Sequence, residues 1–593
     1  MLTALDWTIV IVVVAVTFAP AVLLARRAGA STTEFFLSGR AAPWWLIGVS
    51  MVATTFSTDT PNLVTQLVRE GGVAANWVWW AFLLTGMTTV FFYARLWRRL
   101  GLLTDLEFYE LRYSGRPAAW VRGFRAIYLG LIFNVVIMAT VNLAAAKIAN
   151  VLLGWPLMQT LLVCAILNVL FAATSGLWGV LVTDLIQFGI AMTGATLAAV
   201  YALGHPAVGG LEGLRTALDP QVLGLVPDWG DRAAVLTIFV VPLTVQWWAT
   251  WYPGSEPGGG SYVAQRMLAA RSERDAVAGT LLFNVAHYAL RPWPWLLVAL
   301  ASLLVFPDLE AVRTALPHVD PRLVGHDMAY PAMLTFLPAG VLGLMVAGLL
   351  SAYISTISTH LNWGTSYLVH DFYRRFLRPG ADERHYVRAG RLVTAALMVV
   401  AVAVTPVLDS ARDAFNLLLS IGAGTGLIYL LRWYWWRVNA WSEIAAMACS
   451  FGLAIAAFAL RRAGVDLPVS TTLVATVAIT TIVWLAVAWS TAPTDAAVLR
   501  SFYLQARPAG PGWNTVRPSV GGRAAGTDPM APAILGVAGG CACVYGVLFG
   551  TGHALLGDTT SAFFCLAAAG VGAAAVRKAL AGSLPFSRTS VSG

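Results

Sequence analysis

The chain is poor in charge, in cysteine and most of all in lysine. Only 11% of its 593 residues are Asp, Glu, Lys or Arg, against about 25% in an ordinary soluble domain. Its five cysteines lie in apolar surroundings, and so small and odd a number gives neither a disulfide framework nor a metal-binding spacing. The only lysines are Lys147 and Lys578. Neither follows the Gly-rich loop that cradles a nucleotide phosphate, and this excludes an ATP-driven pump.

Apolar residues are abundant instead, at 58% of the chain. Because about 20 apolar residues cross the roughly 30 Å of hydrocarbon in a bilayer, we predict an all-α integral membrane protein. The net charge of +9 is spread over connecting loops, which argues against a basic face for nucleic acid. We expect about fifteen transmembrane helices, over residues 3–25, 43–68, 74–98, 119–150, 157–176, 178–203, 233–252, 275–305, 330–368, 388–408, 411–432, 436–460, 470–490, 532–552 and 558–578.

The distribution of Lys and Arg over the loops predicts the orientation. If the N-terminus lies outside, the cytoplasmic loops hold 28 of these residues and the outer loops hold 8, as the positive-inside rule requires. The first helix begins with Asp6 and is followed by Arg26 and Arg27, the reverse of a signal peptide. We therefore expect an outer N-terminus and a cytoplasmic C-terminus. The Arg- and Ala-rich composition favours a bacterial inner membrane.

Two of the predicted helices are interrupted. Residues 53–62 place five hydroxyls, Asp59 and Pro61 inside an apolar span, and residues 251–260 are rich in Gly and Pro. Taken singly, the first is typical of a proline kink and the second of a loop. They lie five helices apart, however, and broken helices at corresponding places in two halves are typical of an inverted-repeat transporter's binding site.

Two further helices carry polar residues. In one, the hydroxyls of Ser351, Ser355, Ser358 and Thr359 form a single helical stripe. Neutral oxygens of this kind bind Na⁺ in transporters, but such a stripe also joins helices to one another. In the other, Asp184 lies near the helix start, where an acid either caps the helix or binds a cation.

His287 and Arg291 are spaced i, i+4 near the middle of the eighth helix, so they share one face. The arginine can fork onto a carboxylate or polar oxygens of a solute, and the histidine can hydrogen-bond or titrate. Equally, the two residues can form an internal ion pair with Glu256 or Asp59. The sequence leaves both interpretations open.

Four motifs occur in order along the chain, and together they resemble the sodium:solute symporter family over about residues 5–490. The motifs are Phe35 to Arg40, Thr183-Asp184 with Gln187, Gln265-Arg266 to Ser272, and Ser355-Thr356 followed by Asn362, Ser366 and Asp371. The run that starts at Gln265 is similar to that of the family's sugar-transporting branch. The resemblance implies a LeuT-type core of two five-helix inverted repeats, 43–203 and 233–432, working by alternating access.

This resemblance also implies the domain organisation. The expected parts are an N-terminal extra helix (1–30), the ten-helix transport core (43–432), two accessory helices (436–490), a cytoplasmic linker (491–531), and two C-terminal accessory helices with a short tail (532–593).

The family's ion sites map onto named residues here. The resemblance implies one Na⁺ site, formed by the carbonyls of Ala53, Phe56 and Ala352 and the hydroxyls of Ser355 and Thr356. In some members a second cation site uses an acid and neighbouring hydroxyls. Its counterparts are Asp184, Ser355, Ser358 and Thr359.

The substrate positions match less well. The residues expected to contact solute are Asp59, Thr60, Trp251, Tyr252, His287, Arg291 and Asn416. His287 stands where the sugar-type members have a lysine-type residue, Phe415 replaces an amide, and 253–260 adds residues to the broken helix. A sugar or polyol is favoured by the Gln265 run, whereas the His287 and Arg291 pair also suits an organic acid or amino acid.

The sequence therefore predicts a transporter without catalytic residues, which couples import of a small polar solute to Na⁺. Its expected partners are that solute and membrane lipid, without nucleic acid, and we expect a monomer or weak homo-oligomer. Three alternatives remain. They are a proton-coupled carrier in which Asp59, Asp184 or His287 titrates, a transporter-like sensor, and a membrane enzyme using His287, His360 and Asp184.

Overall fold

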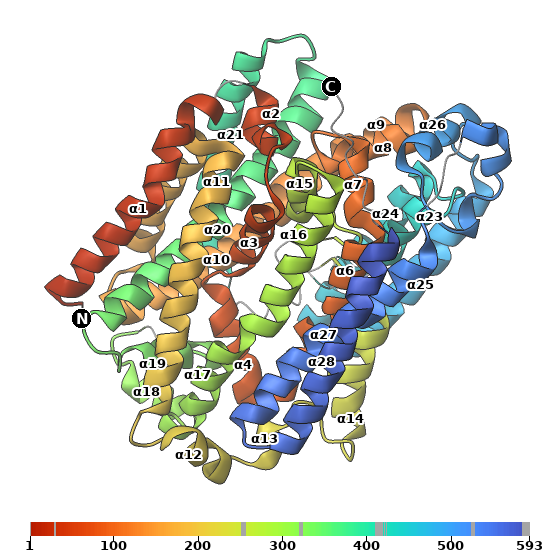
Figure 1. Cartoon of the computed structure of the whole chain (residues 1–593). Helices are drawn as coiled ribbons and strands as arrows, with labels where there is room; N and C mark the ends of the chain where they lie inside the picture. The colour runs from red at the N-terminus through yellow and green to blue at the C-terminus, as the bar shows by residue number, and fades with distance from the viewer. Residues whose placement is uncertain are drawn as a thin grey trace, which may run out of the picture.

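The computed structural model describes residues 2–28, 31–250, 256–319, 324–408, 419, 422, 424–523 and 528–583. This part of the chain is helical throughout, and its only β-pairing is an isolated bridge between Ala42 and Ala270. Figure 1 shows the helices packed side by side in one bundle. Within the described residues, 11 helices are long and apolar enough to cross a membrane: Ala4–Leu24, Val73–Leu100, Gly115–Leu153, Gly176–Leu203, Glu273–Val305, Val341–Leu377, Glu383–Val407, Ala440–Arg461, Val469–Ser490, Met530–Leu555 and Thr559–Gly582.

Three further apolar helices are shorter, namely Trp44–Thr55, Leu157–Ala172 and Arg232–Gln246. The difference from the expected fifteen spans arises largely where helices are broken, because a broken helix has no single segment of full length. In addition, much of the predicted span 411–432 lies outside the described residues. The prediction of an all-helical membrane protein is confirmed.

The predicted interruption near Pro61 is a complete break in the helix. Helix α3 (Trp44–Thr55) ends before Phe56, whose φ of −91° and ψ of 89° are not helical, and α4 begins at Asp59. Pro61 lies in the first turn of α4 (Asp59–Gly71), where a missing N–H removes no intrahelical bond. The proline therefore favours a fresh start after the break rather than a kink.

The second interruption is described only from Glu256 onward. Before it, residues 235–246 are wound as two π-helical segments, and after it α15 (Ser261–Ala269) begins. Residues 251–255, which include Trp251 and Tyr252, lie outside the described part of the chain.

The two predicted helices 157–176 and 178–203 follow one another within α11 (Leu157–Leu203) and are separated by a non-helical kink at Gly176. Gly176 has a φ of +54°, a left-handed conformation that glycine adopts without penalty. Helix α11 packs against α20 (Val341–Ser366), α3 and α1 (Ala4–Ala28). Helix α20 also contacts α3 and α15, so the break in α3 lies against the hydroxyl-rich helix.

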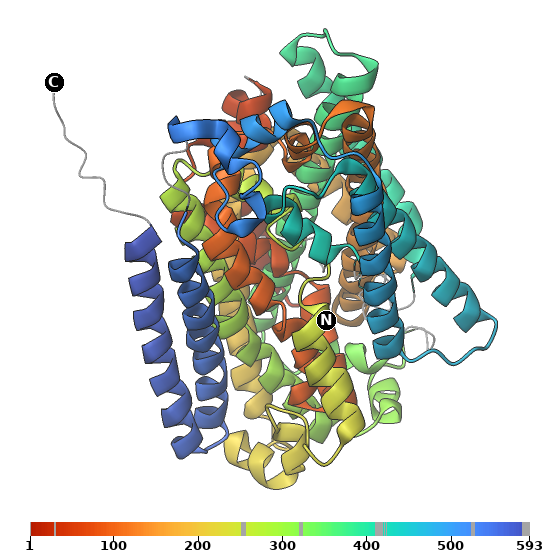
Figure 2. The same cartoon turned by 90° about the vertical axis from the view of Figure 1, so that its right-hand side faces the viewer.

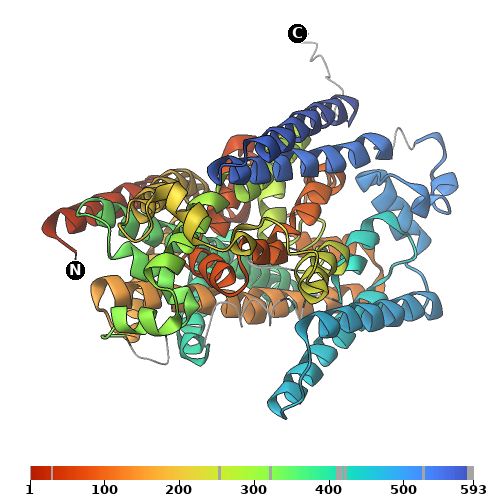
Figure 3. The same cartoon turned by 90° about the horizontal axis from the view of Figure 1, so that it is seen from below.

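The accessory helices lie on the flanks of this core. Helices α27 (Met530–Leu555) and α28 (Thr559–Ser583) pack on one another, and α27 contacts α6 (Leu83–Thr88). Figures 2 and 3 show this dark-blue pair on a different side of the bundle from α24 (Ala440–Arg462) and α25 (Val469–Ser490). Trp293 Nε1 donates a hydrogen bond to the Leu548 carbonyl at 2.8 Å, which fixes α27 to the core.

Candidate ion and solute site

The four motifs found in the sequence converge on a buried polar cluster. At its centre is Asp184 on α11, whose carboxylate accepts hydrogen bonds from the Ser355 hydroxyl at 2.6 Å and from the Ser50 hydroxyl. The Arg266 guanidinium of α15 lies 3.9 Å from the same carboxylate. All four side chains are at most 1% exposed. The acid therefore joins α3, α11, α15 and α20 rather than capping its own helix.

Arg266 makes further contacts inside this cluster. Its Nη2 donates to the Thr359 hydroxyl at 2.8 Å, its Nε to the Ser50 hydroxyl at 3.2 Å, and its Nη1 to the Gln265 side-chain oxygen at 2.8 Å. A fully buried arginine requires an opposite charge and several acceptors, and the cluster supplies both.

Gln265 in turn holds the motifs together. Its side-chain nitrogen donates to the Phe36 carbonyl at 3.1 Å and to the Asn362 side-chain oxygen at 2.9 Å. The Gln265-Arg266 pair, which resembles the sugar-transporting branch, thus packs α15 against α2 (Thr32–Leu37) and α20. Its described contacts are with this cluster rather than with the residues expected to touch solute.

The end of α3 lies directly against α20. The Thr356 hydroxyl donates to the Thr54 carbonyl at 2.8 Å, and the hydroxyls of Thr54 and Thr359 are 3.1 Å apart. The last carbonyls of a helix lack intrahelical partners, so the break presents backbone oxygens to this face of α20. The structure places the five residues of the expected Na⁺ set in this region, all of them buried: Ala53, Phe56, Ala352, Ser355 and Thr356. Ser358 donates to the Ser355 carbonyl at 3.1 Å.

His287 and Arg291 meet the other side of the same break. His287 Nδ1 is 2.9 Å from the Thr55 hydroxyl, and Arg291 Nη1 donates to that hydroxyl at 2.7 Å. The Arg291 guanidinium lies over the Trp295 ring, 4.8 Å from its centroid. His287 belongs to a π-helical segment, Ala286–Leu290. The segment is wound in this way because the ring of Pro292, which follows it, would clash with a carbonyl of a regular α-helical turn.

Within the described residues Glu256 does not pair with Arg291, although it is one of the two partners that the sequence leaves open. Glu256 instead pairs with Arg125 and lies 3.8 Å from Arg432, in a separate buried cluster of charges. Asp59 accepts a hydrogen bond from the Ser57 hydroxyl beside the break, and the Thr60 hydroxyl donates to the Thr55 carbonyl at 3.3 Å. Asn416, like Trp251 and Tyr252, lies outside the described residues.

Ser50, Thr54 and Thr55 make contacts in the site, although no sequence pattern assigns any of them an individual role. Each belongs to α3, and Thr54 and Thr55 lie in the hydroxyl-rich stretch. In the sequence, Arg266 is only one position of a motif. An arginine that is buried between helices is costly unless it has a function or a partner. The sequence around Arg266 is typical of a loop, however, so it does not predict that this side chain is buried.

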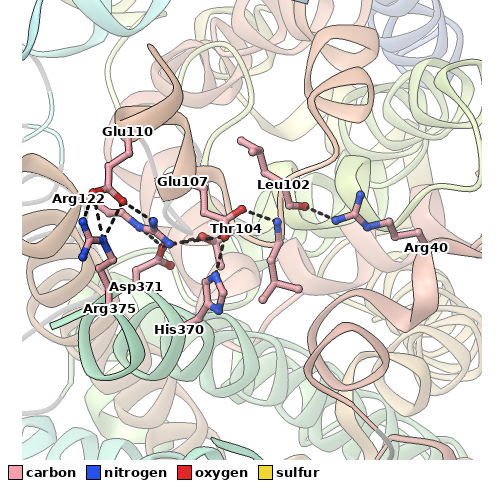
Figure 4. A network of polar contacts seen from close by, with 10 residues as sticks. Arg40, Leu102, Thr104, Glu107, Glu110, Arg122, His370, Asp371 and Arg375 are labelled. Atoms are coloured by element: carbon pink, nitrogen blue, oxygen red, sulfur yellow. Dashed lines mark hydrogen bonds and ion pairs between the residues drawn. The ribbon is translucent and has the colours of Figure 1, made fainter. Parts of the chain in front are cut away.

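A separate polar network lies at the end of the bundle that contains α2, α8 (Phe108–Arg112) and α9 (Gly115–Ile127) (Figures 1 and 4). Arg122 bonds Glu110 at 2.6 Å and Asp371 at 2.8 Å, and His370 lies 2.6 Å from Glu107. Burial raises the pKa of Glu107, but the hydrogen bond and charge of His370 and the charge of Arg122 outweigh it and lower the pKa below its usual value of 4.5. This network links residues Tyr367–Leu377, which continue α20, to α8 and α9.

A broken helix facing a hydroxyl-rich helix, with a fully buried acid beside them, defines a secondary transporter with the LeuT fold. The model of the sodium:solute symporter family matches residues 35–450. The chain belongs to this family, and it is a sodium-coupled solute symporter, not an enzyme.

Named relatives agree with this assignment. The chain is 23% identical over 440 residues to a sodium/glucose cotransporter of Vibrio parahaemolyticus, covering 72% of this chain and 79% of the relative. It is 25% identical over 481 residues to a sodium/mannose cotransporter of Bos taurus, covering 75% and 78%. Among solved structures, a substrate-bound outward-open Na⁺-coupled sialic acid symporter aligns with a TM-score of 0.66 at 20% identity, over 83% of this chain and 99% of that one. The last similarity concerns the fold alone.

Proposed function

We propose that one Na⁺ binds between the broken end of α3 and the middle of α20. Its ligands are the carbonyls of Ala53, Phe56 and Ala352 and the hydroxyls of Ser355 and Thr356. The supporting observation is the 2.8 Å bond from the Thr356 hydroxyl to the Thr54 carbonyl, which holds the two helices in register at the break. Both hydroxyls donate their protons elsewhere and keep lone pairs for a cation, and oxygen is the ligand type that hard cations take.

The bound ion supplies the driving force for import. Each Na⁺ that enters with its charge gains about 2.3 kcal/mol per 100 mV of membrane potential, in addition to its concentration gradient. In this proposal the contact between Thr54 and Thr356 holds α3 against α20 while the ion is bound. Loss of the ion removes that stabilisation and favours rearrangement of the two helices.

We further propose that the solute contacts the opposite side of the break, at Thr55, His287 and Arg291, with Asp59, Thr60, Trp251, Tyr252 and Asn416 around it. A sugar or polyol is favoured, because the named relatives are glucose and mannose cotransporters. The described residues also place an aromatic ring beside the polar groups, since Trp79 lies edge-on to His287 with 5.7 Å between ring centroids.

A solute with a carboxylate is the second candidate. The observation that favours it is the position of the buried Arg291 guanidinium, which donates to the Thr55 hydroxyl beside the break. A planar guanidinium matches a carboxylate through two parallel hydrogen bonds. A sugar acid, organic acid or amino acid would engage it in this way, whereas a neutral sugar would not.

The proposed setting is a bacterial inner membrane, with the N-terminus outside and the C-terminus in the cytoplasm. Residues 43–203 and 233–432 are proposed as the two repeats of the transport core, and the protein as a monomer or weak homo-oligomer. The network of Figure 4 would then lie at the cytoplasmic end, because it surrounds Arg-rich loops.

The solute class is tested by uptake into proteoliposomes with an inward Na⁺ gradient and, in parallel, with an equal K⁺ gradient. Radiolabelled hexoses, polyols, a hexuronic acid and amino acids are compared at equal concentration. Na⁺-dependent uptake of a hexose or polyol supports the favoured solute, and uptake of the acids alone supports the second. Uptake that is equal in Na⁺ and K⁺ would overturn sodium coupling at the proposed site.

A further inference from the structure

The oxygen set that resembles a second cation site already surrounds a positive charge. It consists of the Asp184 carboxylate and the hydroxyls of Ser355, Ser358 and Thr359. Arg266 donates directly to the Thr359 hydroxyl at 2.8 Å and lies 3.9 Å from the Asp184 carboxylate. The guanidinium thus contacts two of the four expected ligands.

The position of Arg266 is specified by four helices. In addition to α20 and α11, the guanidinium bonds Ser50 on α3, and its neighbour Gln265 bonds Phe36 and Asn362. The arginine itself is 0% exposed. A side chain with this many buried contacts has a structural role in the cluster. Its positive charge also offsets the negative charge of the buried Asp184 carboxylate.

A Na⁺ in the same place would face two costs. It would stand beside a buried guanidinium of like charge, and the repulsion between the two charges would weaken Na⁺ binding there. It would also compete with Arg266 for the Thr359 hydroxyl and the Asp184 carboxylate, and displacing the arginine would leave its charge buried without a partner. The described residues therefore do not fit a second Na⁺ while Arg266 is in place.

We propose that Arg266 is a tethered cation that takes the place of a second Na⁺, so that this chain binds a single Na⁺ in each transport cycle. The residue sets the ion stoichiometry without touching the solute. This inference rests on the proposed function, since it presumes the first Na⁺ site between α3 and α20.

The first test counts the ions bound to the purified full chain by equilibrium binding of ²²Na⁺. We expect about one ²²Na⁺ per chain in the wild type. The Thr356→Val variant is expected to lose it. Two ions in the wild type, falling to one in Asp184→Asn, would overturn the inference and leave the proposed function standing. No bound Na⁺ in a folded wild type would instead overturn the proposed function.

The second test removes the tethered charge. In Arg266→Gln the cluster keeps its oxygens and gains room, so ²²Na⁺ bound per chain is expected to double and the Hill coefficient for Na⁺ to rise from about one to about two. The double variant Arg266→Gln with Asp184→Asn is expected to return to one ion. Arg266→Lys, which keeps a charge, is expected to stay at one ion.

The matched control is Arg271→Gln, since Arg271 follows the same helix but is exposed, at 58% of its side chain, and pairs with Asp275. It is expected to bind Na⁺ as the wild type does. A folded Arg266→Gln protein that still binds one Na⁺ would contradict the inference. If Arg266→Gln does not fold, the wild-type count decides the question alone.

Discussion

The Thr356 hydroxyl donates a hydrogen bond to the Thr54 carbonyl across 2.8 Å. This contact joins the hydroxyl-rich helix α20 to the last turn of α3, directly before the chain leaves the helix at Phe56. On one side of it lies the Asp184 and Arg266 cluster, and on the other lie His287 and Arg291 at Thr55. The proposed ion and solute positions therefore share one short stretch of broken helix, and this proximity gives a physical route for their coupling.

Replacing Arg291 by Lys separates solute binding from ion binding. The lysine keeps the charge but loses the planar fork and the stacking on Trp295. We expect at least a tenfold loss of solute affinity, or about 1.4 kcal/mol, with the Na⁺ response retained. Isothermal titration with the transported solute, at constant Na⁺, measures the loss. Arg215→Lys, at an exposed arginine, is the control, and an unchanged affinity in Arg291→Lys would remove this residue from the solute site.

Glu256 is expected to be essential for stability. Its carboxylate is paired with Arg125 and faces Arg432, and both members of the Glu256–Arg125 pair are at most 2% exposed. Glu256→Gln leaves buried positive charge uncompensated, and breaking such pairs costs about 3–5 kcal/mol. Thermal unfolding in detergent measures the loss, and Glu256→Gln with Arg125→Met should recover part of it. Glu310→Gln, in an exposed pair, should unfold as the wild type does.

Asp6 stabilises the start of α20 from another helix. Its Oδ1 accepts hydrogen bonds from the backbone N–H groups of Gly340 at 2.7 Å and Gly343 at 2.8 Å. A carboxylate at a helix N-terminus satisfies unpaired donors and the helix dipole. Asp6→Ala is expected to lower stability by about 1–2 kcal/mol, and Asp6→Asn, which keeps one acceptor, by less. Equal unfolding temperatures for Asp6→Ala and the wild type would contradict this role.

The network at Glu107 predicts acid sensitivity. Because the folded-state pKa of Glu107 is below its usual value of 4.5, its contribution to stability is present above that value and is lost as the pH falls through the lowered pKa. Glu107→Gln should therefore be less stable than the wild type at neutral pH, and the difference should shrink in acid. Unfolding temperatures measured between neutral pH and about pH 3.5 test this, with the exposed Glu212→Gln as control. A pH-independent difference would contradict it.

The sequence predicted the elements of the site better than their contacts. Pro61 among hydroxyls, taken together with the second interrupted segment five helices further on, correctly predicted a broken helix. The family motifs correctly predicted the fold, and the family model confirmed them. The partners of Arg266 could not be predicted in the same way, since Asp184 is far from it in sequence and the two meet because α15 and α11 both pack on α3 and α20.

Asp6 is a second residue whose tertiary contacts could not be predicted from the sequence around it. In the sequence it only distinguishes the first helix from a signal peptide, whereas in the structure it caps a helix more than 300 residues away. The π-helical turn at His287 is likewise invisible in the i, i+4 spacing, although Pro292 is its physical cause. Local pattern predicts local structure, and the tertiary partners decide what each polar residue does.

The most direct test of the account is a Na⁺ titration of thermal stability at constant ionic strength, with K⁺ replacing Na⁺, on the wild type, Thr356→Val and Thr140→Val. Thr140 is a buried threonine that bonds a carbonyl of its own helix, so it controls for the loss of a buried hydroxyl. Na⁺ at about 100 times its dissociation constant should stabilise the wild type and Thr140→Val by about 2.7 kcal/mol, and Thr356→Val should lose this response. An equal response to Na⁺ and K⁺, or a Thr356→Val protein that still responds to Na⁺ as the wild type does, would contradict the proposed ion site.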